Sequence, residues 1–150
     1  MPQSLSHIIV HLVFSTKHRE SLIADDVREA LHSYMAGVFQ GIDSPALLIN
    51  SMPDHVHVLF MLSRKLSLAD VLEEIKTKTS KWMKARDSRF ADFYWQNGYG
   101  AFSVSQSNVK GVRKYISNQE EHHRTRTFQE EFLLLCKRHG VPYDERYMWD

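Results

Sequence analysis

Two segments, residues 5–15 and 55–62, constrain the fold more than any other feature of this chain. Both are rich in apolar and β-branched residues, as is typical of β-strands. Successive side chains of a strand point to opposite faces, and in both segments one face is apolar while the other carries histidines. An apolar face needs a cover, so we expect a sheet with helices packed against one side. The apolar faces consist of Ile8, Val10, Leu12 and Phe14 in the first segment and of Val56, Val58, Phe60 and Leu62 in the second.

The order of the predicted elements indicates the fold class. Apolar residues recur at helical spacing in several other segments, and two more segments have the pattern of strands. The result is an α+β fold, a ferredoxin-like or RRM-like βαββαβ antiparallel sheet with added C-terminal helices. By analogy with that fold, the first and third strands are central neighbours. The predicted elements are strand 5–15, helix 25–40, strands 44–51 and 55–62, helix 67–85, strand 99–106 and helices 108–123 and 127–139.

The composition is that of an ordinary globular domain. The chain has 150 residues, of which 43% are hydrophobic and 25% charged, and we expect one domain spanning residues 1–150. The net charge of +1 points to no class of partner. The single cysteine, Cys136, cannot form an intrachain disulfide, which fits a cytoplasmic location, and its apolar surroundings predict a core position. The N-terminal residues lack the pattern of a signal peptide, and we expect no membrane span.

Histidines on the second face of the two strands suggest a functional site. His55 and His57 are two residues apart, so both point away from the apolar face, and His7 and His11 do the same on the first strand. A patch of up to four histidines in the middle of a sheet is a candidate site. The H-x-H motif alone is equally well explained by a structural pair. Two imidazoles can bind one divalent ion, but a third ligand has to come from elsewhere.

A tyrosine and a glutamine on the predicted helix 108–123 offer the missing chemistry. Tyr115 and Gln119 are four residues apart, which places them one turn apart on one face of the helix. Taken alone, the pair is more simply a surface tyrosine and a solvated glutamine. Beside the H-x-H motif, however, Tyr115 offers a nucleophilic oxygen and Gln119 a carbonyl oxygen as the third metal ligand.

This combination resembles the HUH single-tyrosine transposases of short bacterial insertion sequences, to which the REP-associated tyrosine transposases are related. The resemblance rests on the H-hydrophobe-H strand, on the Y-x-x-x-Q helix that carries the catalytic tyrosine, and on VFSTKHRE, MPDHVHVLF, WQNGYGAFSVS, YISNQEEHH and YDERYMWD. It implies that Tyr115 is the nucleophile and that His55, His57 and Gln119 hold Mg²⁺ or Mn²⁺. It further implies a homodimer in which the tyrosine helix of one subunit can complete the partner's site. The implied substrate is single-stranded DNA at the hairpin ends of an insertion element.

The implied reaction is cleavage and rejoining of a DNA strand. Tyr115 attacks a phosphodiester, and the products are a 5′-phosphotyrosine and a free 3′-hydroxyl that can later reverse the step. The energy of the bond is kept, so no ATP is needed. A phenol has an ordinary pKa of about 10, so its deprotonation needs help. The ion, Lys114 or His122 could supply that help.

Several further residues are candidate contacts for DNA. Residues 76–86 contain five basic and no acidic residues, a composition that could follow a DNA backbone but also suits a solvated helix face. Trp95, Tyr99 and Phe102 could stack on unpaired bases, although such aromatic residues more often lie in the core. The candidate phosphate contacts are Lys17 and Arg19 after the first strand, Lys78 and Lys81 in the basic segment, and Arg113 on the tyrosine helix.

Three alternatives to a transposase remain open. A domesticated relative would apply the same nuclease chemistry to repeated palindromes of a host genome. A non-catalytic module would bind single-stranded nucleic acid on its sheet, and replacing Tyr115 with phenylalanine would leave its function intact. A metal hydrolase of small phosphoesters would release its product to water and would form no covalent adduct with DNA.

Overall fold

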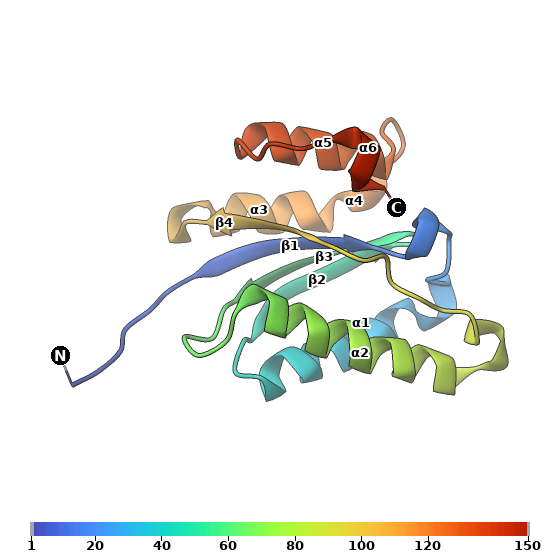
Figure 1. Ribbon diagram of the computed structural model, residues 1–150, viewed down its shortest axis with the longest axis horizontal. Coiled ribbons are helices and arrows are strands. Elements are labelled where there is room, and N and C mark those ends of the chain that lie inside the picture. The colour runs from blue at the N-terminus through green and yellow to red at the C-terminus, as the bar shows by residue number, and fades with distance from the viewer. Residues whose placement is uncertain (1, 150) are drawn as a thin grey trace.

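A four-stranded antiparallel sheet with helices on both faces forms the molecule (Figure 1). The computed structural model describes residues 2–149, so Met1 and Asp150, the two ends of the predicted domain 1–150, lie outside the described residues. The main elements are β1 Ile9–Ser15, α1 Asp25–Gly41, β2 Ala46–Met52, β3 His55–Met61, α2 Leu68–Arg86, β4 Gly100–Val104, α3 Val109–Ser117, α4 Gln119–His122, α5 Phe128–Arg138 and α6 Glu145–Met148.

The strand order β2-β3-β1-β4 confirms the predicted fold class and the central position of β1 and β3. These two strands pair antiparallel, with Val13 opposite His57 and Ser15 opposite His55. His11 lies two positions from Val13, so its side chain is on the same face as the two histidines of β3. The register therefore gathers the strand histidines on one side of the sheet.

The apolar face of the sheet is covered by α1 and α2, as predicted (Figure 1). Side chains such as Leu12 of β1, Leu31 of α1 and Ile75 of α2 are fully buried in one core. The predicted member Ile8 is an exception, because β1 begins one residue later and Ile8 is 46% exposed. Ser67 caps α2 through a reciprocal capping box with Asp70, which explains why the helix begins there.

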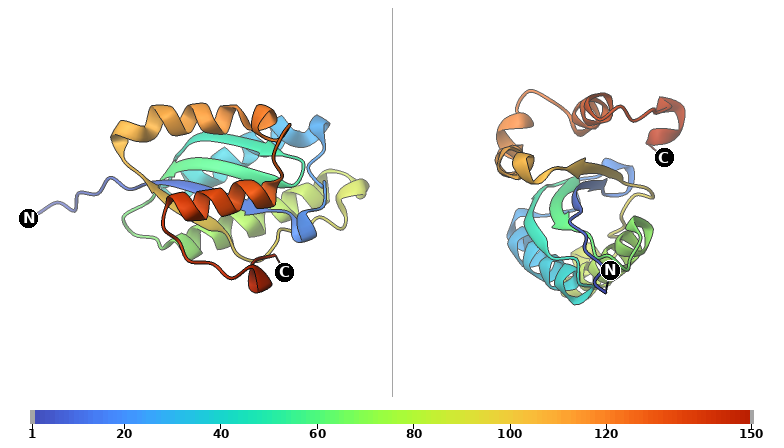
Figure 2. Two further views of the ribbon diagram at one scale, coloured as in Figure 1. Left: turned by 90° about the horizontal axis from the view of Figure 1, so that it is seen from above. Right: turned by 90° about the vertical axis from the view of Figure 1, so that its left-hand side faces the viewer.

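The histidine face is covered as well, by the C-terminal helices α3, α4 and α5 (Figures 1 and 2). All residues of β1 are consequently buried, which accounts for its nearly continuous apolar sequence. His11, His55 and His57 lie beneath these helices. Three of the up to four expected histidines are thus buried on this face, whereas His7 precedes β1, is exposed, and lies 2.7 Å from Gln106 through its Nε2 atom.

The predicted helix 108–123 is two helices, because regular α-helical geometry ends at Asn118. The backbone N–H of Asn118 donates to the carbonyl oxygens of both Lys114 and Tyr115, and its backbone angles leave the helical range. Asparagine is a poor helix former, since its side chain competes for backbone hydrogen bonds. The break separates Tyr115 from Gln119 by an irregular residue.

Polar contacts and close packing hold the C-terminal helices on the sheet. The amide of Asn50 on β2 donates to the carbonyl oxygen of Ile116 on α3 at 2.7 Å. On β4, a side chain at Gly100 would overlap the ring of Phe132, so glycine permits α5 to approach the strand. The C-terminal tail contacts the rest of the molecule, since the ring of Trp149 packs against Phe132. Among the described residues, no helix has both the length and the apolar character needed to span a membrane.

Candidate active site

His55 and His57 are fully buried on β3, and both orient their Nε2 atoms toward the same space beneath α5. The Nδ1 atom of His55 lies 2.7 Å from a carboxylate oxygen of Asp54. The Nδ1 atom of His57 lies 2.8 Å from Nε2 of His11. A partner at one ring nitrogen fixes the orientation of an imidazole and leaves the other nitrogen to the site, as in the histidines of metal centres.

A carboxylate from α5, Glu131, lies at the point where the imidazoles converge. Its Oε1 atom is 3.1 Å from Nε2 of His57 and 3.4 Å from Nε2 of His55. A further imidazole, that of His123, places its Nε2 atom 3.1 Å from the same oxygen. Glu131 is only 1% exposed, so this carboxylate is enclosed by imidazoles rather than by water.

The predicted nucleophile and the predicted third ligand meet the same carboxylate. The hydroxyl of Tyr115, which is partly buried, donates a hydrogen bond to Oε2 of Glu131. The amide nitrogen of Gln119 donates to that oxygen as well, at 3.0 Å. The amide oxygen of Gln119 lies 3.2 Å from Nε2 of both His55 and His123. One chain therefore brings together all four residues that the sequence singled out.

The electrostatics of the cluster follow from burial and these contacts. Burial alone would lower the pKa of His55, but Asp54 and Glu131 outweigh it and raise the pKa to about 9. For His57 burial dominates and lowers the pKa. Burial, followed by the charge of Glu131, raises the pKa of the Tyr115 phenol. The phenol therefore keeps its proton at neutral pH in the absence of a cation.

The donor atoms have the spacing and chemistry of a site for a divalent cation. Ligand atoms that bind one ion at about 2.1 Å and at right angles are about 3 Å apart. The contacts of His55 and His57 with Glu131 and Gln119 range from 3.1 to 3.4 Å. Potential ligand atoms of His55, His57 and Glu131 all lie within 4.8 Å of one another. Mixed nitrogen and oxygen donors suit Mn²⁺ or Zn²⁺ better than Mg²⁺, which prefers oxygen.

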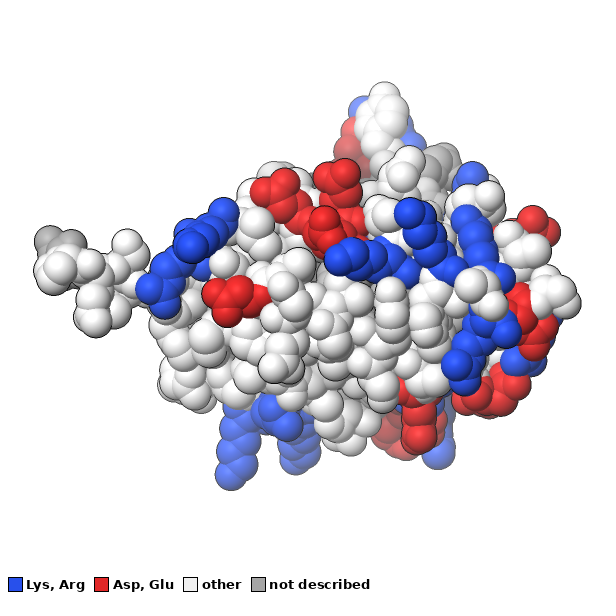
Figure 3. Space-filling model, turned by 90° about the horizontal axis from the view of Figure 1, so that it is seen from below, with Lys and Arg blue, Asp and Glu red and all other residues white. Residues whose placement is uncertain are grey.

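Three of the candidate DNA contacts do not line this site. Lys78 and Lys81 project from α2, which covers the opposite face of the sheet, and Lys78 pairs with Glu74 at 3.0 Å. On that face Lys and Arg side chains are mixed with Asp and Glu, so no uniform basic track forms (Figure 3). The guanidinium of Arg113 donates to the carbonyl oxygen of Leu47 at 2.9 Å, a contact that attaches α3 to β2.

The two candidate helpers of Tyr115 occupy different positions. Lys114 is exposed on α3. The imidazole of His122 packs against the Tyr115 ring, with 4.6 Å between the ring centroids. Its Nε2 atom is buried and has no hydrogen-bond partner among residues 2–149. His122 is thus the nearer of the two candidates, although it contacts the ring and not the hydroxyl.

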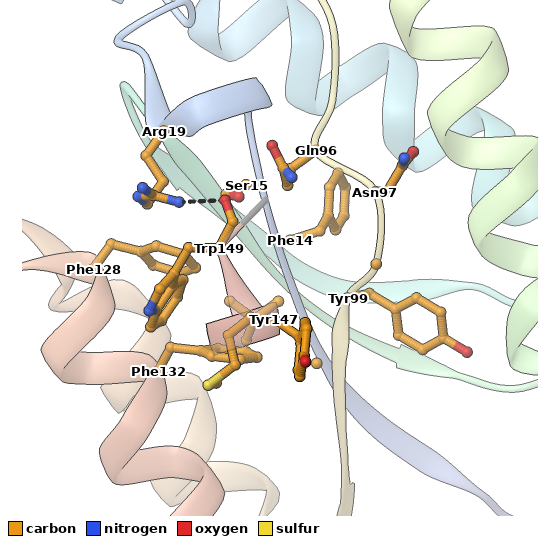
Figure 4. A pocket seen from close by; sticks show the side chains of 14 residues that line it. Phe14, Ser15, Arg19, Gln96, Asn97, Tyr99, Phe128, Phe132, Tyr147 and Trp149 are labelled. Carbon is orange, nitrogen blue, oxygen red and sulfur yellow. Dashed lines mark hydrogen bonds between the residues drawn. The ribbon is translucent and has the colours of Figure 1, made fainter. Parts of the chain in front are cut away.

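A cavity of about 240 Å³ opens between the ends of β1 and β4 and the C-terminal helices (Figure 4). Arg19 lies at its edge, where the guanidinium donates to the carbonyl oxygen of Trp149 at 2.9 Å and lies over the Trp149 ring. Arg19 ends a short 3₁₀ turn, Lys17–Arg19, and Lys17 at the start of this turn is exposed. The other side chains labelled in Figure 4 are Phe14, Ser15, Gln96, Asn97, Tyr99, Phe128, Phe132 and Tyr147.

The aromatic residues considered for base stacking divide between core and cavity. Trp95 and Phe102 are 8% and 4% exposed, and the indole N–H of Trp95 donates to the hydroxyl of Thr79. These two residues belong to the core, as the more common alternative anticipated. Tyr99 is 42% exposed and lines the cavity. Cys136 is buried, as predicted.

Sequence reasoning missed Glu131 and the supporting role of Asp54. A signal for Glu131 was available, because it follows Phe128 by three residues and precedes Leu135 by four. These three residues share one buried face of α5, and a glutamate on an apolar helical face is rare unless it is paired. Asp54 lies in the turn between the predicted strands 44–51 and 55–62, where the sequence pattern indicates no functional role. Its contact with His55 depends on the conformation of that turn.

Fold and site together define a class of protein. A ferredoxin-like sheet in which two strand histidines lie beside a helical tyrosine is the arrangement expected of the HUH class. The model of the family described as "Transposase IS200 like" matches residues 4–119, and the chain belongs to this family. The family confirms the resemblance seen in the sequence.

Curated relatives and solved structures agree with this family. The chain is 21% identical to the ISDra2 transposase TnpA of Deinococcus radiodurans, over 74% of this chain and 83% of the relative. It is 24% identical to the transposase of insertion element IS200 of Salmonella typhimurium, over 74% and 76%. A crystal structure described as a transposase of D. radiodurans R1 superposes with a TM-score of 0.61 at 21% identity, covering 77% of this chain and 93% of that one. The structure of a REP-associated tyrosine transposase bound to a REP hairpin superposes with a TM-score of 0.60 at 13% identity, covering 82% of this chain and 74% of that one. At these identities the structural matches concern the fold.

Proposed function

We propose that this protein cleaves and rejoins single-stranded DNA through a covalent bond to Tyr115, with a divalent metal ion held beside it. One observation carries the proposal: the hydroxyl of Tyr115 and the free nitrogens of His55 and His57 meet at one buried carboxylate. A tyrosine that only supported the fold would not need a cation-binding set of side chains next to its hydroxyl. The family supports the same conclusion, since its members are named as transposases.

The proposed step is a transesterification at phosphorus. The Tyr115 oxygen forms a bond to the phosphorus atom of the DNA backbone, and the bond from phosphorus to the 3′ oxygen breaks. The phenol gives up its proton, and the departing 3′ oxygen becomes a hydroxyl. The product is a 5′-phosphotyrosine, and the reverse reaction with a 3′-hydroxyl rejoins a strand.

The residues that would hold the ion are His55, His57 and Gln119. When bound, a divalent ion withdraws charge from the phosphate and orients it for in-line attack. The chain itself supplies rigidity: Asp54 and His11 hold the two imidazoles, and the fully buried Gln119 cannot turn toward solvent. Preorganised ligands of this kind reduce the entropy that binding and reaction would otherwise cost.

The aromatic cavity beside the site suits the passage of an unpaired strand. Phe128 contributes to its wall and also stacks on His55, with 4.4 Å between ring centroids. Arg19 offers positive charge at the edge, and Tyr99 offers an exposed ring. Bases stack on aromatic side chains while basic residues contact phosphates, so the cavity suits single-stranded DNA. One structural relative is bound to a REP hairpin, which supports DNA with a hairpin as the substrate.

The first test is a search for the covalent adduct. The wild-type protein and Tyr115→Phe are each incubated with labelled single-stranded DNA that carries a hairpin, with Mn²⁺ or with EDTA. We expect an adduct on denaturing gels only for the wild type with metal. Tyr34→Phe, which changes a tyrosine of α1 on the opposite face of the sheet, serves as the matched control and should form the adduct.

The alternatives give different results in the same experiment. A hydrolase of small phosphoesters would release product without an adduct. A binding module would retain the DNA without cleaving it, and Tyr115→Phe would bind as the wild type does. Hairpins from insertion-element ends and from repeated palindromes, compared side by side, would separate a transposase from a domesticated nuclease.

A further inference from the structure

Among residues 2–149, Glu131 is the one carboxylate enclosed by the candidate site, and neither the H-x-H motif nor the Y-x-x-x-Q motif includes it. We propose that Glu131 is a ligand of the divalent ion, additional to the two histidines and the glutamine, and that its second oxygen positions Tyr115. The inference rests on the proposed function, because it assumes that the cluster binds a cation. It extends that function to a residue outside the region matched by the family model, which ends at residue 119.

The surroundings of Glu131 are the first argument. A carboxylate that is 1% exposed loses nearly all of its hydration and needs compensation. Arginine or lysine would be the usual partner of a buried carboxylate, but the contacts of its Oε1 atom are with the imidazoles of His55, His57 and His123. Imidazoles combined with a carboxylate are a common ligand set of catalytic metal centres. The partners of Glu131 thus match a cation site better than a structural salt bridge.

The different contacts of its two carboxylate oxygens are the second argument. Oε1 faces the imidazole nitrogens at 3.1 to 3.4 Å, a separation expected for ligands of one ion. Oε2 accepts hydrogen bonds from the Tyr115 hydroxyl and from the amide of Gln119. One carboxylate can therefore bind the ion through one oxygen and hold the nucleophile through the other. This arrangement places the phenol next to the metal without a flexible link.

The attachment of α5 is the third argument, because a ligand must be held firmly. Thr127 and Glu130 form a reciprocal capping box at the start of the helix. One face of α5 packs through Phe128 and Leu135 against Val13 and Phe102 of the sheet. Glu131 lies on this buried face, so its side chain is directed at the histidines by the packing of the whole helix. The C-terminal helices thus contribute chemistry and not only cover.

The test is a direct measurement of Mn²⁺ binding, which needs no DNA and no activity. Free Mn²⁺ is followed by electron paramagnetic resonance during titration of the wild type, Glu131→Gln and Glu131→Asp. We expect Glu131→Gln to weaken binding by about 100-fold or more, at or above the effect of removing an outer-sphere partner. Glu131→Asp keeps the charge and should recover part of the affinity. Glu130→Gln removes the same charge from the neighbouring position, where an amide oxygen can still accept from the backbone N–H and the hydroxyl of Thr127, and should bind like the wild type.

A crystal structure of the wild type with Mn²⁺ protects the test against a variant that fails to fold. Anomalous scattering from manganese should show the ion bonded to a Glu131 oxygen. An ion bound by His55, His57 and Gln119 with Glu131 turned away would overturn the inference, as would unchanged Mn²⁺ affinity in a folded Glu131→Gln. Both results would leave the proposed function intact. Failure of the proposed function would appear separately, as the absence of a Tyr115-dependent adduct from protein that binds Mn²⁺ through Glu131.

Discussion

At the scale of single residues, the chemistry of His55 is set by its neighbour in the sequence. The carboxylate of Asp54 accepts a hydrogen bond from Nδ1–H, so the lone pair of a neutral imidazole lies on Nε2, which faces the site. The same contact contributes to the raised pKa of His55. A carboxylate behind a metal-binding histidine orients the ring and increases its basicity. We therefore assign Asp54 a positioning role.

Asp54→Asn should weaken Mn²⁺ binding by about 10- to 100-fold, because an amide no longer favours the required tautomer of His55. Titration of Mn²⁺ followed by electron paramagnetic resonance measures the effect. Asp43→Asn is the matched control: Asp43 is exposed and has a φ of 55°, a conformation that asparagine also tolerates. Equal affinity of Asp54→Asn and the wild type would argue against this role.

At the scale of secondary structure elements, the site depends on how closely α5 approaches the sheet. Gly100 on β4 permits this approach, since a Cβ atom there would overlap the ring of Phe132. On the other side, Asn50 ties β2 to the backbone of α3. The sheet thus holds the helix that bears Tyr115 and the helix that bears Glu131 by separate contacts. Both contacts, that of Gly100 with α5 and that of Asn50 with α3, therefore determine the distance between Tyr115 and Glu131.

Gly100→Ala should destabilise the protein by about 1–3 kcal/mol, the usual cost of inserting atoms into a packed interior. It should also weaken Mn²⁺ binding, because α5 has to move away from the histidines. Gly37→Ala offers a contrast: this exposed glycine of α1 has no atom within 4 Å of an added Cβ, so alanine should stabilise the helix by about 1 kcal/mol. Urea denaturation measures the stability of both variants, and titration followed by electron paramagnetic resonance measures the affinity of Gly100→Ala for Mn²⁺. A Gly100→Ala protein as stable as the wild type would show that Phe132 can turn aside at no cost.

At the scale of the whole molecule, one chain contains a complete set of candidate residues. Tyr115 contacts Glu131, which in turn contacts His55 and His57. The resemblance to HUH transposases leads to a different expectation, a homodimer that can exchange its tyrosine helices. That dimer stays a prediction. The contacts within the chain favour a site whose nucleophile and metal ligands come from the same subunit.

Mixing two inactive variants distinguishes these arrangements. His55→Ala lacks a ligand and Tyr115→Phe lacks the nucleophile. If the site is formed within one chain, the mixture should form no more adduct with hairpin DNA than either variant alone. Recovery of the adduct would instead establish that subunits exchange tyrosines. Circular dichroism of each variant, and light scattering of the mixture, verify that the chains are folded and report their association.

Much of this organisation could be predicted from local patterns. The two-residue period of the segments around Leu12 and Val58 predicted both central strands and the layer of α1 and α2. The spacing of Tyr115 and Gln119 was informative even though Asn118 interrupts the helix. The basic segment around Lys81 was less informative. A run of charges indicates that one face of a helix is solvated, but it does not indicate which layer of the molecule that helix forms.

The sequence by itself determined the strands, the faces on which their histidines lie and the family, because these depend on neighbours within a few residues and on characteristic motifs. Only the tertiary structure decided that the histidine face is buried, that Glu131 enters it from α5 and that Lys78 lies on the opposite side of the sheet. These contacts can join residues more than 70 positions apart in the sequence, as His57 and Glu131 are. They follow from the packing of apolar faces, and periodicity along the chain does not specify which faces meet.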